Sequence, residues 1–501
     1  MQRVAVADMG SNSWRLVVFG YEPGTPWWSL VDEIREAVRV GAGLAEAGAI
    51  RPERIDRALH TAAVFASFCR ASGIEEVEAL ATSAIRDAAN GPALLDAIRE
   101  RTGLEPRVIS GREEARYDWL AIANSTTIEE GFGLDMGGGS IQALRIEGRR
   151  LAEAESLRLG SVRVSEEFLP GEKAPAKAMK ALRRKAAGEL ESLGWWGDGG
   201  RLVGVGGTIR NLAAAAMKRA ELPALDVQGF ELTRDALEDL IESLADRPAS
   251  KRGDLPGIKP DRGDVILGGA LVLAAALDSG GFDRIEVSEA GLREGAFFDR
   301  LLGEQKLFDD VRKESVLNLG HRFNADPGHV ERVAALSLEM FDGLARAGLH
   351  ELGAAERELL WAACMLHDIG TAIDYDDHHR HSHYLILNAG LPGFTPRELV
   401  LVGLIARYHR KGDPDTTELG PLEERGDSER LRLLSAIIRL AEQLERSRDG
   451  AIRRVRVAAQ DGTVALDADV DPARDSSVPI WAARREAGLL AHALGREVEI
   501  G

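Results

Sequence analysis

The spacing of apolar and polar positions divides the chain into three parts. Up to Leu302, short apolar runs alternate with glycine-containing turns and amphipathic segments, a pattern that predicts alternating strands and helices. Apolar positions then recur at helical spacing in four longer segments: Val330–Leu349, Ala354–His367, Pro396–His409 and Ser428–Ser447. After Gly450, two alternating runs around Asp461-Gly462 predict a β-hairpin, and a helix over Val478–Leu494 with a short final strand completes a small α/β part.

Two strand–turn–strand patterns stand out in the first part. Phe132–Ile146 contains Asp135 at a strand end, then three glycines and Ser140, and Val4–Phe19 repeats the pattern with Asp8, Gly10 and Ser11-Asn12-Ser13. Glycine lets main-chain N–H groups approach a ligand, and successive N–H groups make a concave site that suits phosphate. A carboxylate beside such a turn favours a bound magnesium ion or water. The repetition predicts duplicated halves that face each other across a cleft.

Other segments of this part offer further candidates, each with a structural alternative. Gly206, Gly207 and Thr208 form a third glycine turn, which precedes a helix whose N-terminus suits phosphate or ribose. Arg86 follows a strand and is either a phosphate clamp or a helix-surface arginine. The Glu113-Glu114 pair begins a helix, where carboxylates either complement the helix dipole or supply a general base.

Composition limits the class of protein. The chain has 501 residues, of which 45% are hydrophobic and 29% charged, so we expect three or four soluble globular domains. The longest apolar run, Val265–Leu277, is too short for a membrane span, and Met1 leads straight into a strand rather than into a leader. Cys69 and Cys364 are far apart, which predicts buried thiols in a reducing cytoplasm.

The net charge restricts the ligands. A formal charge of −18 argues against general binding to nucleic acids or anionic membranes, because both need a basic field. A polyanionic substrate would need a locally basic track instead. Candidate tracks, each of which also fits a solvated surface, are residues Lys177–Lys185, Lys251–Arg262, His378–His383 and Arg407–Lys411.

Histidine is concentrated in the helical part. Of the 11 histidines, all but His60 and His492 lie between His321 and His409. A mixture of imidazoles and carboxylates suits a divalent metal, although a single histidine more often has a core or surface role. The candidate ligands are His329, His367, Asp368, His381, His383 and His409, with carboxylates later in the chain.

Several strings, in a fixed order, resemble the exopolyphosphatase/guanosine pentaphosphate phosphohydrolase (Ppx/GppA) family. They are DMGSNS (8–13), TSAIR (82–86), ISGREEAR (109–116), DMGGGS (135–140), VGGT (205–208), PDRGDVI (260–266) and GLREG (291–295). The resemblance implies an α/β fold of duplicated actin/hexokinase/Hsp70-like (ribonuclease H-like) domains, then an all-α HD-like domain. We therefore expect actin-like subdomains at residues 1–125 and 126–303, an HD-like domain at 304–450 and a small α/β C-terminal domain at 451–501.

The resemblance also implies roles for individual residues. Glu114 matches the family's base, and Asp135 matches a metal- or water-associated aspartate that would share Mg²⁺ with Asp8. Gln142 stands where the family's DxGGGSxE pattern has glutamate, and glutamine can orient water but cannot accept its proton or neutralise a metal. Either Glu114 is sufficient as base, or metal binding is weakened. The substrate-binding candidates are Ser11, Asn12, Ser13, Arg86, Gly137, Gly138, Gly139, Ser140, Gly207, Thr208 and Arg262.

A second set of implied residues lies in the HD-like part. His329, His367 and Asp368 match an H…HD pattern, and Glu442 takes the place of its closing aspartate as a ligand for another divalent metal. Because this last position departs from the pattern, we favour a structural or substrate-guiding domain over a second active site.

The family resemblance leads to a functional hypothesis. We expect a cytoplasmic, Mg²⁺-assisted exopolyphosphatase that removes terminal phosphate from inorganic polyphosphate by in-line attack of water. The main alternative is a guanosine pentaphosphate (pppGpp) 5′-phosphohydrolase of the stringent response, which would use the same turns. An actin-like ATP-binding kinase or sensor, and an HD phosphodiesterase with a ligand-binding N-terminal part, are further alternatives. The resemblance also implies a homodimer.

Overall fold

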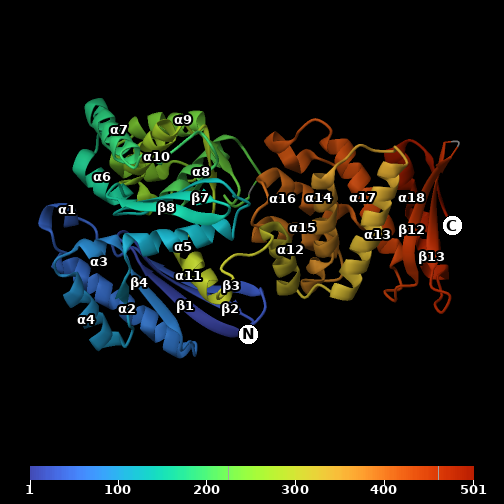
Figure 1. Cartoon of the computed structure of the whole chain (residues 1–501), viewed down its shortest axis with the longest axis horizontal. Helices are drawn as coiled ribbons and strands as arrows, with labels where there is room; N and C mark the ends of the chain where they lie inside the picture. The colour runs from blue at the N-terminus through green and yellow to red at the C-terminus, as the bar shows by residue number, and fades with distance from the viewer. Residues whose placement is uncertain (224, 461) are drawn as a thin grey trace. The chain divides into compact units, whose positions relative to one another are not determined.

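The computed structural model describes residues 1–223, 225–460 and 462–501 (Figure 1). Its contacts divide the chain into two compact units. The first unit comprises Met1–Ala220 with Val227–Val311, and the second comprises Arg312–Gly501 with the short segment Glu221–Asp226. Within the described ranges, no helix combines the length and the apolar character needed to cross a membrane. Cys69 and Cys364 are both free and buried, as predicted.

The first unit begins with a five-stranded sheet of order β3-β2-β1-β4-β5. Strands β1, β2 and β3 pair antiparallel, whereas β4 and β5 continue the sheet in parallel. The strands are β1 (Gln2–Met9), β2 (Trp14–Tyr21), β3 (Trp28–Glu36), β4 (Val77–Ala81) and β5 (Arg107–Val108). The accompanying helices are α1 (Leu44–Ala47), α2 (Pro52–Ala71), α3 (Ser83–Asp87), α4 (Gly91–Thr102) and α5 (Gly111–Ala123).

A second sheet repeats this arrangement, with the order β10-β11-β9-β6-β7-β8. Strands β6, β7 and β8 pair antiparallel, and β9 lies parallel to β6 as β4 lies parallel to β1. The strands are β6 (Gly131–Met136), β7 (Ile141–Glu147), β8 (Arg150–Leu157), β9 (Leu202–Val205), β10 (Glu231–Thr233) and β11 (Arg284–Val287). The shared topology confirms the duplicated actin-like fold, with the predicted turns at equivalent places after β1 and β6.

Helices cover the sheets of the first unit. They are α6 (Ser161–Phe168), α7 (Ala176–Glu191), α8 (Gly207–Arg219), α9 (Arg234–Ala245), α10 (Ile266–Gly280) and α11 (Leu292–Leu301), with 3₁₀ helices η1 (Ala249–Asp254) and η2 (Pro260–Arg262). Helix α5 touches both sheets (Figure 1). Its Tyr117 and Leu120 pack with β1 and β2, while Ala115 and Ile122 pack with β7 and β9. Because a sheet packs on each side of α5, some polar residues of this helix are buried as well.

The second unit is mainly helical. Its helices are α12 (Val311–Arg322), α13 (Pro327–Arg346), α14 (Ala354–Leu366), α15 (His378–Ala389), α16 (Pro396–Tyr408), α17 (Asp427–Leu444) and α18 (Ser477–Leu494), with η3 (Ile369–Ala372) and η4 (Thr417–Leu422). A sheet of order β12-β13-β14 is formed by β12 (Ile452–Gln460), β13 (Thr463–Val470) and β14 (Glu497–Ile500). Strands β12 and β13 form the predicted hairpin, although Asp461 of its turn lies outside the described residues.

One hydrophobic core joins the helices of the second unit to its sheet. Leu404 and Leu434 of the helices belong to the same buried cluster as Val464 and Leu466 of β13. The four long helices predicted from periodicity appear as α13, α14, α16 and α17. The boundary expected near residue 450, like the other predicted domain boundaries, stays a prediction.

Candidate functional site

The two strand–turn–strand motifs meet at a cavity of about 110 Å³ in the first unit. Asp8 and Asp135, at the ends of β1 and β6, line this cavity together with Glu114 of α5. We call it the central cavity. The other predicted residues that line it are Ser11, Asn12, Ser13, Gly137, Gly138, Ser140, Gly207 and Arg262.

The two turns approach each other closely. A Cβ atom on Gly138 would lie 3.1 Å from the Cβ of Ser11, and one on Gly139 would lie 2.8 Å from the Ser11 hydroxyl oxygen. The hydroxyl oxygens of Ser11 and Ser83 are 3.1 Å apart. Side chains at these glycines would fill the space between the turns, which explains the glycine run.

The start of α6 holds the second turn in place. The backbone N–H of Ser161 donates to the carbonyl oxygen of Gly137 over 3.0 Å, and that of Val162 donates to Gly138 over 2.9 Å. The guanidinium of Arg163 donates to the carbonyl of Gly139 over 3.0 Å. Because these contacts fix the carbonyl groups of the turn, its conformation is set by the protein before any ligand binds.

Glu114 has the environment of a general base. Its carboxylate is buried and accepts a hydrogen bond from Arg86 over 3.0 Å. Burial raises the pKa of Glu114 to about 7; the charge of Arg86 opposes this shift, and those of Asp135 and Asp8 add to it. A carboxylate that titrates near neutral pH is well suited to accept a proton from water. The neighbouring Glu113 is paired with Arg107 instead, so the two glutamates have different surroundings.

Further carboxylates accompany Glu114. Burial, followed by the charge of Asp8, raises the pKa of Asp135 to about 7. Asp118, one turn after Glu114 on α5, is fully buried, and its carboxylate oxygens have no hydrogen-bond partner among the described residues. Burial, and then the charges of Asp135 and Glu114, raise the pKa of Asp118 well above its ordinary value.

These acids fit a divalent cation. Unpaired buried carboxylate oxygens are unfavourable without a compensating charge, and oxygen ligands are those that Mg²⁺ prefers. Asp8 and Asp135 offer such oxygens to the central cavity, whereas Asp118 does not line it and interacts with their charges from nearby. Asp118 is not among the predicted site residues, because a single aspartate on an amphipathic helix carries no local signal.

Four arginines line the central cavity, of which only Arg262 was predicted. Arg15 comes from β2, Arg210 from α8 and Arg293 from α11. Burial, followed by the charges of Arg293 and Arg210, lowers the pKa of Arg15 to about 9. Burial, followed by the charge of Arg35, lowers the pKa of Arg262 to about 10. Guanidinium groups crowded in this way favour an anion between them.

Two of the three arginines that were not predicted lie beside or within a motif of the sequence. Arg210 closely follows the VGGT string, and Arg293 lies inside GLREG. Arg15 has no such signal beyond its place two residues after the first turn.

A larger neighbouring cavity, of about 510 Å³, contains Arg86. It shares Ser83 and Ser140 with the central cavity and also includes Gly139, Arg112 and Arg158. The guanidinium of Arg86 donates to the Ile109 carbonyl over 2.8 Å as well as to Glu114. Of the two roles predicted for Arg86, that of a plain helix-surface arginine fits less well, because its side chain is only 23% exposed and contacts the predicted base.

Two predicted site residues line neither cavity. Gln142 is buried on β7, and its amide donates to the hydroxyl oxygens of Ser140 (3.1 Å) and Ser156 (3.2 Å). Thr208 is buried at the start of α8. The contacts of Gln142 support the turn at Ser140, and the catalytic role predicted for Gln142 stays a prediction.

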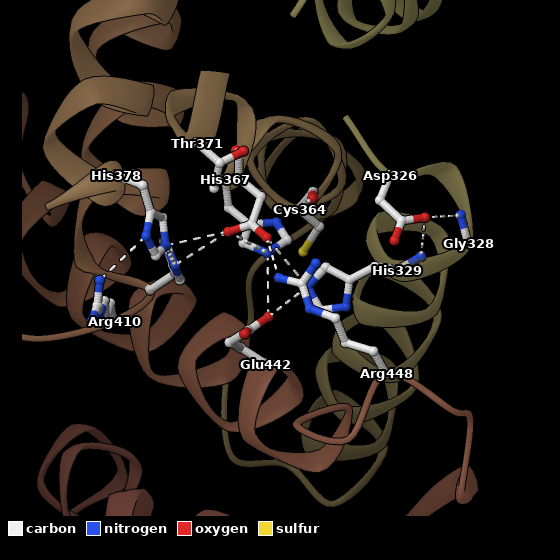
Figure 2. Close-up of polar contacts among 12 residues, drawn as sticks. Asp326, Gly328, His329, Cys364, His367, Thr371, His378, Arg410, Glu442 and Arg448 are labelled. Carbon is white, nitrogen blue, oxygen red and sulfur yellow. Dashed lines mark hydrogen bonds and ion pairs between the residues drawn. The ribbon is translucent and has the colours of Figure 1, made fainter. Parts of the chain in front are cut away.

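The second unit brings together the predicted metal ligands His329, His367 and Asp368, with Glu442 beside them (Figure 2). A second group combines Asp368 with His378 and His409. His381 and His383 belong to neither group, and the Nε2 atom of His383 lies 2.9 Å from Glu418.

Comparison with known proteins gives the same family for both units. Residues 17–304 match the Ppx/GppA phosphatase family, and residues 311–471 match domain III of Ppx/GppA phosphatases. A Ppx/GppA family member from Aquifex aeolicus is 28% identical, with a TM-score of 0.52, over 60% of this chain and 98% of that one. A second structure of an Aquifex aeolicus PPX-GPPA enzyme is 29% identical, with a TM-score of 0.51, over 59% and 98%.

A third structure supports the fold alone. An exopolyphosphatase from Cytophaga hutchinsonii is 22% identical, with a TM-score of 0.56, over 61% of this chain and 100% of that one. The family match over residues 17–304 covers more than half of the 501 residues. The chain therefore belongs to the Ppx/GppA phosphatase family.

Proposed function

We propose that the protein is an exopolyphosphatase, which hydrolyses the terminal phosphate of inorganic polyphosphate. The observation that carries this proposal is the position of Glu114, a buried carboxylate with a pKa of about 7. It faces the same cavity as two glycine turns and four arginines. A base and an anion-binding site are thereby combined in one small space, as attack of water on a phosphate requires.

The proposed mechanism assigns a task to each group. The turns at Ser11–Ser13 and Gly137–Ser140 bind the terminal phosphate, and the arginines stabilise negative charge that develops on its oxygens. Glu114 accepts a proton from the attacking water, while Arg86 holds the carboxylate in place. Asp8 and Asp135 would hold Mg²⁺, which when bound would add positive charge near the transferred phosphoryl group.

The neighbouring cavity favours a polymer over a nucleotide. Arg86, Arg112 and Arg158 line it, and it shares Ser83 and Ser140 with the central cavity. A chain whose last phosphate occupies the central cavity would find further guanidinium groups there for its next phosphates.

The proposal is tested by phosphate release from long-chain polyphosphate, pppGpp and ATP at equal phosphate concentration. We expect the highest kcat/KM with polyphosphate, and Arg158→Ala should raise the KM for the polymer more than that for pppGpp. Release from pppGpp alone would assign the protein to the guanosine pentaphosphate phosphohydrolases instead. ATP binding without phosphate release from any substrate would support a kinase or sensor.

The pH dependence of kcat/KM should follow the protonation of Glu114. Because the pKa of Glu114 is raised to about 7, the proton-accepting form is lost as the pH falls through neutrality. We expect kcat/KM to fall about tenfold per pH unit below about pH 6. A carboxylate with an ordinary pKa would keep kcat/KM flat down to about pH 5. The measurement is kcat/KM between pH 5 and 9 at saturating Mg²⁺, and a flat profile would contradict the role of Glu114.

Gly160 offers a test of the second turn. A Cβ atom at Gly160 would lie 2.4 Å from backbone atoms of Gly138, Gly139 and Ser140, so Gly160→Ala must displace the turn. We expect a loss of about 1–3 kcal/mol in the free energy of unfolding, and a raised KM.

The matched control is Gly188→Ala. Gly188 lies inside α7, and a Cβ atom there would meet no described atom within 4 Å. This substitution should leave KM unchanged and keep or raise stability, because alanine is the better helix former. Equal KM values in the two variants would contradict the proposed role of the turn. Both KM and the unfolding transition are measured for each variant.

A further inference from the structure

The first unit contains a further cavity, of about 720 Å³, that the proposed reaction does not use. It lies between α5, the start of β8 and the segment that follows α11, and we call it the side cavity. Neither Glu114 nor any residue of the two glycine turns lines it. A cavity of this size is large enough for a small organic ligand.

Trp119 gives the side cavity an aromatic wall. Its indole N–H donates to the carbonyl oxygen of Arg149 over 2.9 Å, so the polar edge of the ring already has its partner. The side chain is only partly buried, and among the described residues no other aromatic ring stacks on it. Leu151 and Leu307 line the same cavity. Together these side chains form an apolar wall on which a flat ring can stack.

The side cavity is basic, although the whole chain carries a formal charge of −18. Four basic and two acidic side chains line it. Two of the basic ones, Arg116 and Lys306, share the carboxylate of Asp299. The other two, Arg112 and Arg150, are exposed and have no ion-pair partner within the described ranges. Two guanidinium groups are therefore available to an anion in this cavity.

The acidic side chains of the side cavity do not cancel these charges. Glu113 pairs with Arg107, which lies outside the cavity. Glu304 is the other acidic residue, and it is exposed. One carboxylate faces two unpaired guanidinium groups, so the cavity keeps a net positive charge.

The wall at residues 304–307 has a fixed shape. The side-chain amide of Asn124 donates to the carbonyl oxygen of Lys306 over 2.9 Å and accepts from the backbone N–H of Phe308 over 2.8 Å. Lys306 has a φ of 62°, a left-handed conformation that side chains other than glycine seldom adopt. Because Asn124 holds this conformation, the wall is formed before a ligand binds, which lowers the entropy lost on binding.

We infer that the side cavity binds a nucleotide, with its base stacked on Trp119 and its phosphate held by Arg112 and Arg150. Aromatic side chains stack on any base, and guanidinium groups match the oxygens of phosphate. Polyphosphate fits this cavity less well, because a chain of phosphates has no apolar surface to cover the tryptophan and the leucines. The cavity holds no glycine turn, and the proposed base lies outside it, so the nucleotide is bound there and not hydrolysed.

The position of the side cavity makes the nucleotide an effector. Arg112 and Leu151 also line the neighbouring cavity, through which the polymer is proposed to reach the central cavity. A phosphate that binds Arg112 from the side cavity removes one guanidinium group from that path. This consequence rests on the proposed function, and it predicts that the nucleotide raises the KM for polyphosphate. Binding itself is independent of that function.

The test measures calorimetric binding of adenosine 5′-monophosphate (AMP) to the full chain. AMP has no phosphoanhydride bond, so its binding is not confused with turnover. Trp119→Leu, which keeps an apolar side chain without an aromatic face, should weaken AMP binding about 5–150-fold. Arg150→Ala should weaken it about tenfold. Ribose 5-phosphate, which lacks the base, should bind wild type at least about ten times more weakly than AMP.

Two further arginine variants are the controls. Arg262→Ala removes a guanidinium group from the central cavity, and Arg101→Ala removes an exposed one from α4. Both should bind AMP as wild type does. If Trp119→Leu does not fold, Arg150→Ala and ribose 5-phosphate decide, because Arg150 is exposed and ribose 5-phosphate is tested on wild type.

Three results would overturn the inference. The first is AMP binding that weakens in Arg262→Ala and not in Arg150→Ala, because AMP would then occupy the central cavity. The second is equal affinity for AMP and ribose 5-phosphate, which would exclude stacking of the base. The third is the absence of AMP binding to wild type. None of these results depends on whether the protein hydrolyses polyphosphate.

Discussion

Replacing Glu114 with glutamine should lower the rate of phosphate release from polyphosphate by about 10²–10⁴-fold, the usual contribution of a general base. Glutamine keeps the size of the side chain and an oxygen that can accept the hydrogen bond from Arg86, but it cannot take a proton from water. The loss should appear in kcat, because the terminal phosphate is bound by the turns and the arginines. Steady-state phosphate release by wild type and variant measures the effect.

Glu113→Gln is the matched control for this experiment. Glu113 precedes Glu114 on α5, pairs with Arg107 and does not line the central cavity. Its replacement should leave kcat close to the wild-type value. The unfolding temperature of Glu114→Gln should not fall, because the substitution removes a buried charge. Comparable rates in wild type and Glu114→Gln would refute the assignment of the base.

The local parts of the first site could be predicted from sequence. Asp8 and Asp135 each lie within a single strand–turn–strand segment. The residues next to them in the sequence are therefore sufficient to predict the strand, the turn and the position of the carboxylate. The selection of Glu114 over Glu113 rested on family resemblance, and the structure shows the physical difference between them. Burial and the ion pair with Arg86 distinguish Glu114, and neither can be read from periodicity.

The missed residues come from contacts that are distant in sequence. Arg210 and Arg293 reach the central cavity only because α8 and α11 begin beside it. Asp118 is buried because α5 packs against both sheets, whereas an isolated amphipathic helix would have a free polar face. Such positions depend on tertiary packing, so even a residue beside a recognisable motif, such as Arg210 or Arg293, cannot be placed in the cavity from the sequence alone.

In the second unit, the rotation of successive residues around helix α15 decides which histidines of one run reach the buried cluster around Asp368. The run HHRHSH offers four histidines, but successive residues of a helix point in directions about 100° apart. Because α15 begins at His378, that residue faces Asp368, and His383 faces Glu418 instead. The sequence predicted that a cluster would form around His367 and Asp368, and it did not determine which member of the run would complete the second group.

Asp118→Asn should both stabilise the metal-free protein at alkaline pH and weaken its binding of Mg²⁺. Folding raises the pKa of Asp118. At pH values between the pKa of the unfolded state and that of the folded state, the folded state therefore binds more protons than the unfolded state. Stability contributed by the protonated carboxyl is therefore lost as the pH rises. Asparagine has no charge to bury, and we expect it to raise the free energy of unfolding at pH 8 by about 1–3 kcal/mol.

The same substitution removes a negative charge close to Asp135 and Asp8, the two carboxylates proposed to hold Mg²⁺, so the affinity for Mg²⁺ should fall by about 10–100-fold. Thermal unfolding at pH 5 and pH 8, with and without Mg²⁺, measures both effects, because Mg²⁺ should raise the unfolding temperature of wild type more than that of the variant. Asp56→Asn, on the exposed surface of α2, should change neither quantity. An Asp118→Asn protein that is less stable than wild type at pH 8, or that binds Mg²⁺ equally well, would show that Asp118 is a structural residue without influence on the cation site.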